Sequence, residues 1–387
     1  MRIHKVEAFP IRIKREAGWL AGQESRDITD YGDYFIDNAF FTSIYPKHHE
    51  TAVVRIETNT GIVGWGESFA PVGARATAQI VEDLVAPIVL AQDPFDAEFL
   101  WYRAYSAMRE RGHATGFYID ALSGVDQALY DIVGKAIDKP AAKVLGGVCR
   151  GKVRAYAGFG GTEPDDMARR AKELLGYGYT ALKLHLRVSN AEIAEIVKAV
   201  RDVIGDHIEI MVDVHTTRDV SQAIALGRLL EPLGVRWLES PTGPEDIDGQ
   251  AEIARALDMQ VASAEWVRTA YDWRWWLEKR GVDCAMPDIG RTGLTEGRRI
   301  AHLCDVYNVP VAPHVGAGGI LAIAAGIQLS ATIPKFQILE HGHHALAVKA
   351  AFASDYPEPV DGHFVLDDKP GLGVTVDENK LAELVIS

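Results

Sequence analysis

Polar residues suited to catalysis or metal binding close a series of short apolar stretches in the second half of the chain. In order they are Asp213, Glu239, Glu265, Asp288, His314 and Glu340. The first three are acids. If strands bring them side by side, each pair of charges about 4 Å apart repels by ~4 kcal/mol at an effective dielectric of about 20. Such a cluster needs either protonation or a cation, and three carboxylates suit Mg²⁺.

Asp288 and His314 close neighbouring apolar stretches and can therefore touch. An Asp carboxylate that bonds one imidazole nitrogen fixes the tautomer and stabilises the imidazolium, so the other nitrogen becomes a general base. The stretch "PVAPHVGAGG" places His314 directly before a glycine-rich loop, where a ligand can approach closely. This pattern favours a catalytic dyad over a structural histidine.

Lys183 and His185 end the stretch "ALKLHL" and share one face of the predicted strand, because side chains alternate along a strand. Lys183 can neutralise a substrate carboxylate or a developing negative charge, and the alternative is a solvated surface lysine. His185 can be a second acid or base. His215, two residues after Asp213, can donate a proton to a leaving group or simply bond a neighbouring carboxylate. Glu340 can donate a hydrogen bond if it is protonated, or bond a substrate hydroxyl.

A histidine-rich stretch, "EHGHHALAV", adds His341, His343 and His344. Short histidine-rich tracts are typical of metal sites. This one lies beyond the predicted strand, in a loop, and the three acids form a better site. A second metal site here is therefore a minor alternative.

The elements that must position these residues are strands and helices in alternation from about residue 152. Eight stretches predict strands: "VRAYAGF", "ALKLHL", "EIMVDVH", "VRWLES", "QVASAEW", "CAMPDI", "VPVAPH" and "FQILEH". Repeated strand–helix units imply parallel strands, and eight of them fit a closed (β/α)8 barrel. The active site of such a barrel lies at the carboxyl ends of its strands, where the polar residues stand.

The N-terminal part has a different pattern. Strands are predicted at residues 2–13, 51–58 and 62–67, and helices at about 73–91, 94–110 and 115–137. The "NTG" between the last two strands is typical of a hairpin, so we expect a small antiparallel sheet. Residues 14–50 show no clear period. Their many aromatic side chains indicate a functional segment rather than plain disorder.

Length and composition exclude several classes of protein. A chain of 387 residues predicts two domains, and a net charge of −14 argues against nucleic acid as a partner. No apolar stretch reaches the roughly 18 residues of a membrane span, and "MRIHKVEAF" lacks the apolar core of a signal peptide. Cys149, Cys284 and Cys304 have no metal-ligand spacing, so we expect reduced thiols and a cytoplasmic protein.

Several motifs resemble the enolase superfamily and, within it, the mandelate racemase branch. "IVGWGES" is similar to the hairpin of its capping domain, and "ALSGVDQALYDIVGKAIDKPAAKVLGG" to the link between cap and barrel. "MVDVH", "LESP", "SAEW", "MPDIGRTGLTEGRRIA" and "APH" are similar to its strand-end motifs, in the same order. The resemblance implies an α/β fold: a modified (β/α)7β barrel at 131–354, and an α+β capping domain at 1–130 completed by about 355–387.

The resemblance also implies roles for the residues. One Mg²⁺ per subunit is expected on the three acids Asp213, Glu239 and Glu265. The Asp288–His314 dyad removes the proton α to a substrate carboxylate, and Lys183 helps to stabilise the resulting enediolate. The segment 14–50 is expected to cover the substrate. Candidates to select the substrate are Asp33, Tyr34, Lys47 and His48. A homo-oligomer is implied as well.

Two departures from the racemase pattern favour a dehydratase. The second strand reads Lys183-Leu184-His185, where the racemase has a lysine at both outer positions, and His215 follows the expected metal ligand by two residues. The Asp-x-His arrangement resembles the galactonate and mannonate dehydratases. We therefore expect elimination of water from an aldonic or aldaric acid, giving a 2-keto-3-deoxy acid. His314 is the base, His215 the leading acid, and His185 the alternative acid or second base, while Glu340 and Lys183 bind substrate.

The runner-up is a racemase, epimerase or lactone cycloisomerase on the same scaffold. A zinc hydrolase barrel would need His-x-His at the end of the first strand, and "RAYAGFGG" has none. A non-catalytic sugar-acid binding protein would not need the complete set of ligands, dyad and second-strand lysine. The sequence therefore favours an enzyme.

Overall fold

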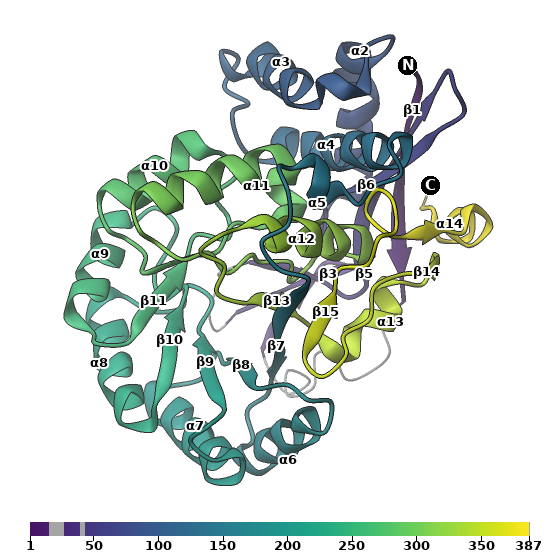
Figure 1. Ribbon diagram of the computed structural model, residues 1–387. Helices are drawn as coiled ribbons and strands as arrows, with labels where there is room; N and C mark the ends of the chain where they lie inside the picture. Colours follow the sequence, from purple (N-terminus) through teal and green to yellow (C-terminus); the bar gives the residue numbers. More distant parts are fainter. Residues whose placement is uncertain (15–26, 39–42, 387) are drawn as a thin grey trace.

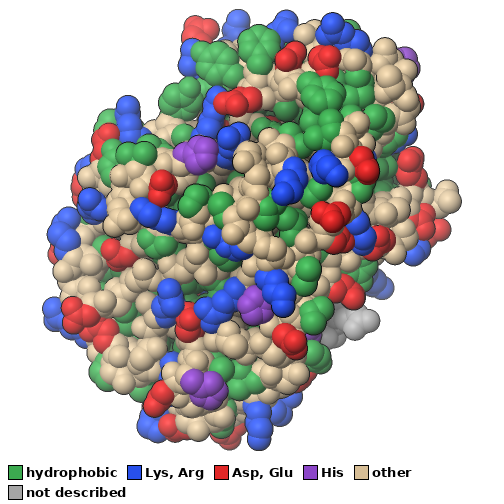
Figure 2. All heavy atoms as spheres, in the orientation of Figure 1, with side chains coloured by type: hydrophobic (Ala, Val, Ile, Leu, Met, Phe, Trp, Pro, Cys, Tyr) green, Lys and Arg blue, Asp and Glu red, His purple; other side chains and the backbone are tan. Residues whose placement is uncertain are grey.

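The computed structural model describes residues 1–14, 27–38 and 43–386. Parallel strands surrounded by helices form a barrel, beside which an N-terminal unit packs antiparallel strands against helices (Figure 1). The marked ends of the chain lie on the same side of the molecule. Figure 2 shows acidic and basic side chains interspersed over this face. Within the described residues, none of the helices combines the length and apolar composition that crossing a bilayer requires.

Parallel strands of the barrel follow one another in chain order. They are β7 (Lys152–Gly160), β8 (Ala181–His185), β9 (Glu209–Asp213), β10 (Val235–Glu239), β11 (Gln260–Ser263), β12 (Cys284–Ala285) and β13 (Leu339–His341). The predicted strand at 309–314 forms only isolated parallel bridges, from Val311 to Ala285 and Phe336 and from His314 to Asp288. Since β13 pairs with β7, these bridges close an eight-membered barrel.

Helices cover the outside of the barrel and connect its strands. They are α6 (Pro164–Leu175), α7 (Asn190–Ile204), α8 (Val220–Leu230), α9 (Ile247–Ala256), α10 (Ala270–Glu278), α11 (Ile289–Val306) and α12 (Ile320–Thr332). A short 3-10 turn, Glu231–Leu233, follows α8. Over residues 152–341, all of which are described, seven helices therefore alternate with eight strand positions. The expected (β/α)7β barrel is confirmed.

The barrel interior is filled by an apolar layer below the polar residues. Its members are Tyr156, Ala181, Met211, Trp237, Ala262, Cys284, Met286, Ala312 and Ile338. Side chains two positions apart on a strand share a face. Lys183, Asp213, Glu239, Asp288, His314 and Glu340 each follow a member of this layer by two residues. The alternation that fills the barrel thus also places the polar groups at its mouth.

An antiparallel sheet of β1 (Ile3–Ile13), β5 (His49–Thr58) and β6 (Val63–Ser68) confirms the three predicted N-terminal strands. The helical elements of this unit are α1 (Ala74–Ile80), a π-helical turn (Val81–Val85), α2 (Ala86–Val89), a 3-10 turn (Pro94–Asp96), α3 (Ala97–Arg109) and α4 (Phe117–Ala136). Helices α1 and α4 and the π-helical turn lie against the sheet, whereas α3 packs on α4. Helix α4 packs directly on β6. A Cβ added to Gly66 would lie 2.0 Å from the Gly124 carbonyl oxygen, so only glycine permits this approach.

The C-terminal segment returns along both parts of the molecule. After α13 (Leu346–Lys349), strand β14 (Ala353–Asp355) pairs with β16 (Thr375–Val376), and β15 (His363–Val365) pairs with β7 of the barrel. Helix α14 (Glu378–Leu384) lies beside β1, where the Ile386 amide donates to the Pro10 carbonyl at 2.9 Å. The domain limits at 130 and 355 stay our proposal, since α4 runs through residue 130 and α5 (Ala141–Val144) follows it.

Described parts of the segment 14–50 form a second small antiparallel sheet. Its strands are β2 (Ile28–Asp30), β3 (Tyr34–Asp37) and β4 (Ile44–Pro46). The sequence predicted no regular element here, because three or four residues are too few to establish a period. The three cysteines are all free thiols, as expected.

Candidate active site

The three predicted metal ligands converge at the barrel mouth. Asp213 and Glu239 end neighbouring strands in direct register, and Glu265 lies just beyond β11. Their exposed fractions are 3%, 0% and 6%. The ammonium of Lys183 lies between them, 2.6 Å from Glu239 Oε1 and 3.5 Å from Asp213 Oδ2. It also lies 2.8 Å from Glu340 Oε1, so one buried cation serves three carboxylates.

Burial and crowding control the charge states of this group. Burial raises the pKa of Glu239 well above its usual range, although the Lys183 charge opposes this. Burial also raises the pKa of Glu265. Burial alone would lower the pKa of Lys183, yet the charges of Glu239 and Glu340 raise it well above its usual value. The site therefore contains more acidic groups than its one ammonium neutralises, as a cation site requires.

Individual carboxylate oxygens show how a cation would fit. The Trp237 indole donates to Glu239 Oε2 at 3.0 Å, and the His215 amide donates to Asp213 Oδ1 at 2.8 Å. Each bond orients its carboxylate. Glu265 Oε2 is buried and has no hydrogen-bond partner among the described residues. A buried oxygen beside two oriented acids suits a hard cation such as Mg²⁺.

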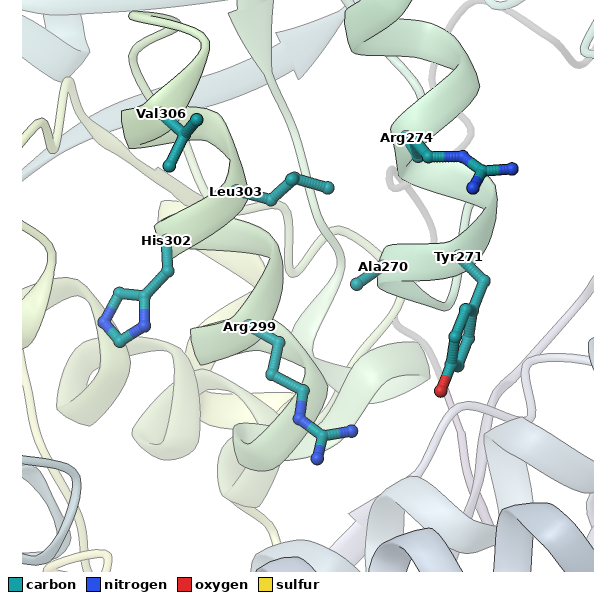
Figure 3. A pocket seen from close by; sticks show the side chains of 7 residues that line it. All are labelled: Ala270, Tyr271, Arg274, Arg299, His302, Leu303 and Val306. Atoms are coloured by element: carbon teal, nitrogen blue, oxygen red, sulfur yellow. The ribbon is translucent and has the colours of Figure 1, made fainter.

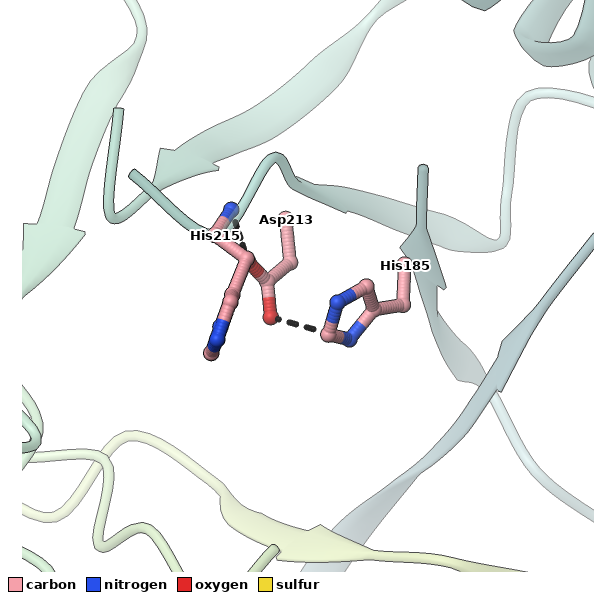
Figure 4. Close-up of side chains that lie close together, drawn as sticks. All are labelled: His185, Asp213 and His215. Carbon is pink, nitrogen blue, oxygen red and sulfur yellow. Dashed lines mark hydrogen bonds and ion pairs between the residues drawn. The ribbon is translucent and has the colours of Figure 1, made fainter. Parts of the chain in front are cut away.

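A second potential metal-binding group shares Asp213. The side chains of His185, Asp213 and His215 each offer a ligand atom, and these atoms lie within 4.8 Å of one another. In the part of the chain that the structure describes, this is the only group found with that spacing. Figure 4 shows the His185 ring beside the Asp213 carboxylate, with Nδ1 3.5 Å from Oδ2. Two imidazoles suit softer divalent metals than Mg²⁺.

Metal-binding measurements distinguish the two groups. We expect Glu265→Gln to weaken Mg²⁺ binding by more than the roughly 10- to 100-fold that loss of an outer partner costs, because an anionic ligand is lost. His185→Asn, the matched control, should change Mg²⁺ affinity less than about threefold. Titration calorimetry of the purified variants measures both. A large loss in His185→Asn with none in Glu265→Gln would place the ion on the histidine pair.

Asp288 and His314 form the predicted contact. Their backbones are joined by a parallel bridge, and His314 Nδ1 lies 2.5 Å from Asp288 Oδ2. His314 Nε2 lies 3.2 Å from Glu340 Oε2 and 3.6 Å from Glu265 Oε2. Burial would lower the pKa of His314, but the charges of Glu340, Glu265 and Asp288 raise it to about 10. His314 can therefore act as a base only when a cation or the substrate offsets the negative charge of those acids.

His185 and His215 face Asp213 on another side of the mouth, with ring centroids 5.4 Å apart. Burial lowers the pKa of His185 to about 4 and also lowers that of His215. His215 Nδ1 is 4.0 Å from Glu265 Oε1. His215 and His314 therefore approach the same carboxylate, one at each oxygen.

Backbone conformation at the mouth is unusual in a way that the sequence did not indicate. His215, Ser240 and Ala264 have φ values of 47°, 43° and 74°. Residues other than glycine rarely adopt such values, and they persist where surrounding contacts enforce them. All three lie within two residues of a predicted metal ligand.

Sequence reasoning missed two side chains that approach the mouth. Arg187 is 4% exposed, its Cζ lies 4.7 Å from the centre of the Tyr45 ring, and its Nη1 lies 3.9 Å from Asp37 Oδ2. Tyr45 in turn lies 6.0 Å from the His215 ring. Arg187 follows His185 by two residues, so the alternation that selected Lys183 and His185 also indicates it.

Of the four predicted substrate-selecting residues, Asp33 and Tyr34 contact the N-terminal sheet, whereas Lys47 and His48 contact residues of their own segment. Asp33 pairs with Arg12 at 2.7 Å, and the Tyr34 hydroxyl donates to Glu50 at 2.8 Å. Lys47 pairs with Asp30 at 2.6 Å, and His48 Nε2 lies 4.0 Å from Asp33. Their role in selecting substrate stays a prediction. Within the described residues of this segment, Asp37 and Tyr45 make the contacts with barrel residues reported above.

The histidine-rich stretch does not lie in a loop beyond the strand, as the sequence predicted, because His341 is the last residue of β13 and His343–Ala345 form a 3-10 turn. His341 is buried against Tyr179 and Phe364, and its two ring nitrogens lack hydrogen-bond partners among the described residues. His343 bonds the Tyr179 hydroxyl at 3.1 Å. No metal-binding group was found here in the described part of the chain.

Burial of His341 predicts a dependence of stability on pH. Burial lowers its pKa to about 3, below the unfolded value of about 6.5, so the unfolded chain takes up a proton first. Stability should fall as pH drops from about 6.5 towards 3, by ~2 kcal/mol at pH 5. Between pH 7 and 5, the stability of His341→Phe should therefore fall by ~2 kcal/mol less than that of the parent. Urea unfolding at both pH values measures the difference, and equal losses would contradict the prediction.

An apolar hollow of about 380 Å³ lies elsewhere on the surface, between α10 and α11 (Figure 3). Its lining includes Tyr271, Arg299 and Val306. None of the predicted site residues lines it.

Comparison with known proteins identifies the family. Residues 166–380 match the family described as "Enolase C-terminal domain-like". Residues 40–146 match "Mandelate racemase / muconate lactonizing enzyme, N-terminal domain". The chain belongs to the mandelate racemase branch of the enolase superfamily. The resemblance inferred from the strand-end motifs is thus confirmed.

Relatives within the superfamily include more than one reaction. An arabinonate dehydratase from Saccharolobus solfataricus is 33% identical over 340 residues, 86% of this chain and 90% of the relative. A D-galactarolactone cycloisomerase from Agrobacterium fabrum is 32% identical over 345 residues, again 86% and 90% of the two chains. The chain is therefore an enzyme of this superfamily.

Solved structures share the whole architecture. A member of the enolase superfamily from Agrobacterium tumefaciens has a TM-score of 0.93 at 28% identity, covering 100% of this chain and 99% of that one. A racemase from Streptomyces coelicolor with bound magnesium has a TM-score of 0.85 at 25% identity, covering 99% of this chain and 100% of that one. Barrel and capping sheet are thus features of the superfamily.

Proposed function

We propose that the chain is a Mg²⁺-dependent dehydratase of aldonic or aldaric acids. The observation that carries this proposal is the approach of two histidines to one carboxylate. His314 Nε2 lies 3.6 Å from one oxygen of Glu265, and His215 Nδ1 lies 4.0 Å from the other. This arrangement places a base and an acid at the two oxygens of the Glu265 carboxylate. Such a pair suits removal of a proton from one carbon and protonation of the hydroxyl on the next.

Binding in this proposal begins with the substrate carboxylate. Asp213, Glu239 and Glu265 would hold one Mg²⁺ per subunit, whose charge would stabilise a carboxylate that gains negative charge. Lys183 adds a fixed ammonium at 2.6 Å from Glu239. Glu340, 2.8 Å from that ammonium, can accept a hydrogen bond from a substrate hydroxyl. Burial of the whole group excludes water and strengthens these interactions.

Elimination then moves two protons. His314 Nε2 takes the proton from C2, while Asp288 holds Nδ1 and stabilises the imidazolium. The C3–O bond breaks, and His215 in its imidazolium form donates a proton so that the hydroxyl leaves as water. His185 is the alternative donor. The resulting enol becomes a 2-keto-3-deoxy acid when it takes a proton at C3 and releases the proton of its C2 hydroxyl, so atoms and charge balance.

A lactone cycloisomerase or racemase is the second candidate, favoured by the galactarolactone relative and by the racemase structure. Dehydration and these isomerisations both begin with removal of the proton at C2, and they differ in the fate of the enediolate. His185 would then serve as a second base rather than as an acid. A homo-oligomer is part of the proposal as well and rests on the resemblance alone.

Product analysis tests the function. The purified protein with Mg²⁺ is incubated with five- and six-carbon aldonic and aldaric acids, and 2-keto acid is assayed. Formation of keto acid from a member of the panel is the expected result. Deuterium uptake at C2 from heavy water without keto acid would overturn the dehydratase in favour of the second candidate.

A further inference from the structure

The backbone that directly follows Asp288, the carboxylate member of the dyad, contacts the N-terminal unit. Asp288 is followed by Ile289 and Gly290 at the start of α11. The Gln127 amide, on α4, donates to the Ile289 carbonyl at 3.2 Å. The Ser123 hydroxyl, one turn earlier on the same helix, donates to the Gly290 carbonyl. Helix α4 therefore holds the backbone one and two residues after Asp288.

Backbone that follows the base of the dyad is held in a corresponding way. Five residues beyond His314, the carboxylate of Glu67 on β6 accepts hydrogen bonds from backbone amides at the start of α12. Its Oε1 accepts from Gly319, and its Oε2 accepts from Leu321 and Ala322 at 3.2 Å each. Glu67 is 1% exposed, and burial raises the pKa of its carboxyl, a rise that the hydrogen bonds from these amides oppose.

Gln127 joins the two contacts into one network. Its Oε1 accepts from the Glu67 amide at 3.2 Å, and its Nε2 donates to the Glu67 carbonyl at 2.9 Å as well as to Ile289. The Thr51 hydroxyl donates to Glu67 Oε1 at 2.8 Å. The approach is tight, because a Cβ added to Gly319 would lie 2.6 Å from that oxygen. One buried amide thus links the segments that carry Asp288 and His314.

We propose that Glu67 and Gln127 are positioning residues that set the geometry of the Asp288–His314 dyad. The proposal rests on the assignment of His314 as the base. The dyad depends on a contact of 2.5 Å between two strands that are joined there by an isolated bridge, with backbone hydrogen bonds from His314 to Pro287 at 3.0 Å and from Ile289 to His314 at 3.2 Å. Displacement of catalytic groups by about 1 Å can cost about 100-fold in rate. The N-terminal unit holds the backbone that follows each strand, at the starts of α11 and α12, and so prevents such displacement.

The alternative is that these contacts only join the two parts of the molecule. Asp131 on α4 supplies a matched control, because it is a buried acid, as Glu67 is. Its carboxylate accepts from the Trp65 amide at 2.9 Å and from the Leu372 amide at 2.8 Å. Both contacts lie away from Asp288 and His314 in the sequence. Asp131→Asn should therefore lower stability without affecting the dyad.

Two readouts on Glu67→Gln test the proposal. In this variant an amide NH₂ replaces an oxygen that accepts backbone hydrogen bonds. We expect kcat to fall about 10- to 100-fold with KM within about twofold. We also expect the low-field proton resonance of His314 Nδ1–H, identified by its absence in His314→Asn, to shift or disappear. The resonance is recorded without substrate, so its result stands even if the proposed dehydration fails. Asp131→Asn should lower Tm comparably and leave both readouts unchanged.

Ser123→Ala provides a milder test if Glu67→Gln does not fold, since it removes only the hydroxyl that donates to Gly290. It should shift the same resonance and lower kcat about three- to tenfold. An unchanged resonance and kcat in a variant with lowered Tm would overturn the proposal. Equal losses of kcat in Asp131→Asn would overturn it as well, because the effect would then be general destabilisation.

Discussion

Replacing His314 with Asn is expected to reduce dehydration at least about 1,000-fold while leaving Mg²⁺ binding intact. General bases contribute typically 100- to 10,000-fold, and Asn has no site of suitable basicity. The amide retains part of the volume of the ring and can still bond Asp288. Steady-state kinetics on the substrate found in the panel, with calorimetric Mg²⁺ titration beside it, measure both quantities.

A histidine elsewhere on the barrel controls for general effects of this substitution. His302 lies on α11 at the surface hollow of Figure 3, and His302→Asn should keep kcat within about twofold. If His314→Asn kept more than a tenth of the parent kcat, another residue would have to be the base.

Lys183→Met is expected to lower both activity and stability, because it leaves buried acids without their cation. Lys183 Nζ lies 2.6 Å from Glu239, 2.8 Å from Glu340 and 3.5 Å from Asp213. Removing one partner of a buried ion pair costs about 3–5 kcal/mol, although Met preserves the volume. Addition of Mg²⁺ should restore part of this loss, since we propose that the cation binds among the same acids. Thermal and urea unfolding with and without Mg²⁺ measure the stability.

An exposed lysine gives the matched control for that substitution. Lys198 pairs with Asp202 at 2.7 Å on the surface of α7, and Lys198→Met should change stability by less than about 0.5 kcal/mol. Unchanged or increased stability of Lys183→Met without Mg²⁺ would contradict the account, because the acids would then be protonated rather than paired with Lys183.

Alternation and spacing predicted the barrel and the group at its mouth. Side chains alternate along a strand, so Met211 fills the interior while Asp213 reaches the mouth, and the same holds for Trp237 and Glu239. Repeated units of strand and helix place such residues at one end of the barrel. A pattern of this kind is local in the sequence, and a single chain reveals it.

Contacts between distant parts of the chain could not be predicted in this way. Glu67 contacts Gly319 across 252 residues, and nothing in the local pattern of β6 indicates which helix it caps. Tyr45 approaches His215 from a segment whose strands are too short to show a period. The left-handed backbone at His215 and Ser240 also depends on tertiary contacts. These features determine the geometry of the site rather than its composition.

Isotope exchange at C2 tests the central assignment of base and acid most directly. The parent, His314→Asn and His215→Asn are each incubated with the substrate and Mg²⁺ in heavy water, and deuterium at C2 of the remaining substrate is followed by NMR beside keto acid formation. We predict that His215→Asn exchanges the C2 proton but forms little keto acid, whereas His314→Asn does neither. Exchange that persists in His314→Asn and is lost in His215→Asn would contradict the account and reverse the two roles.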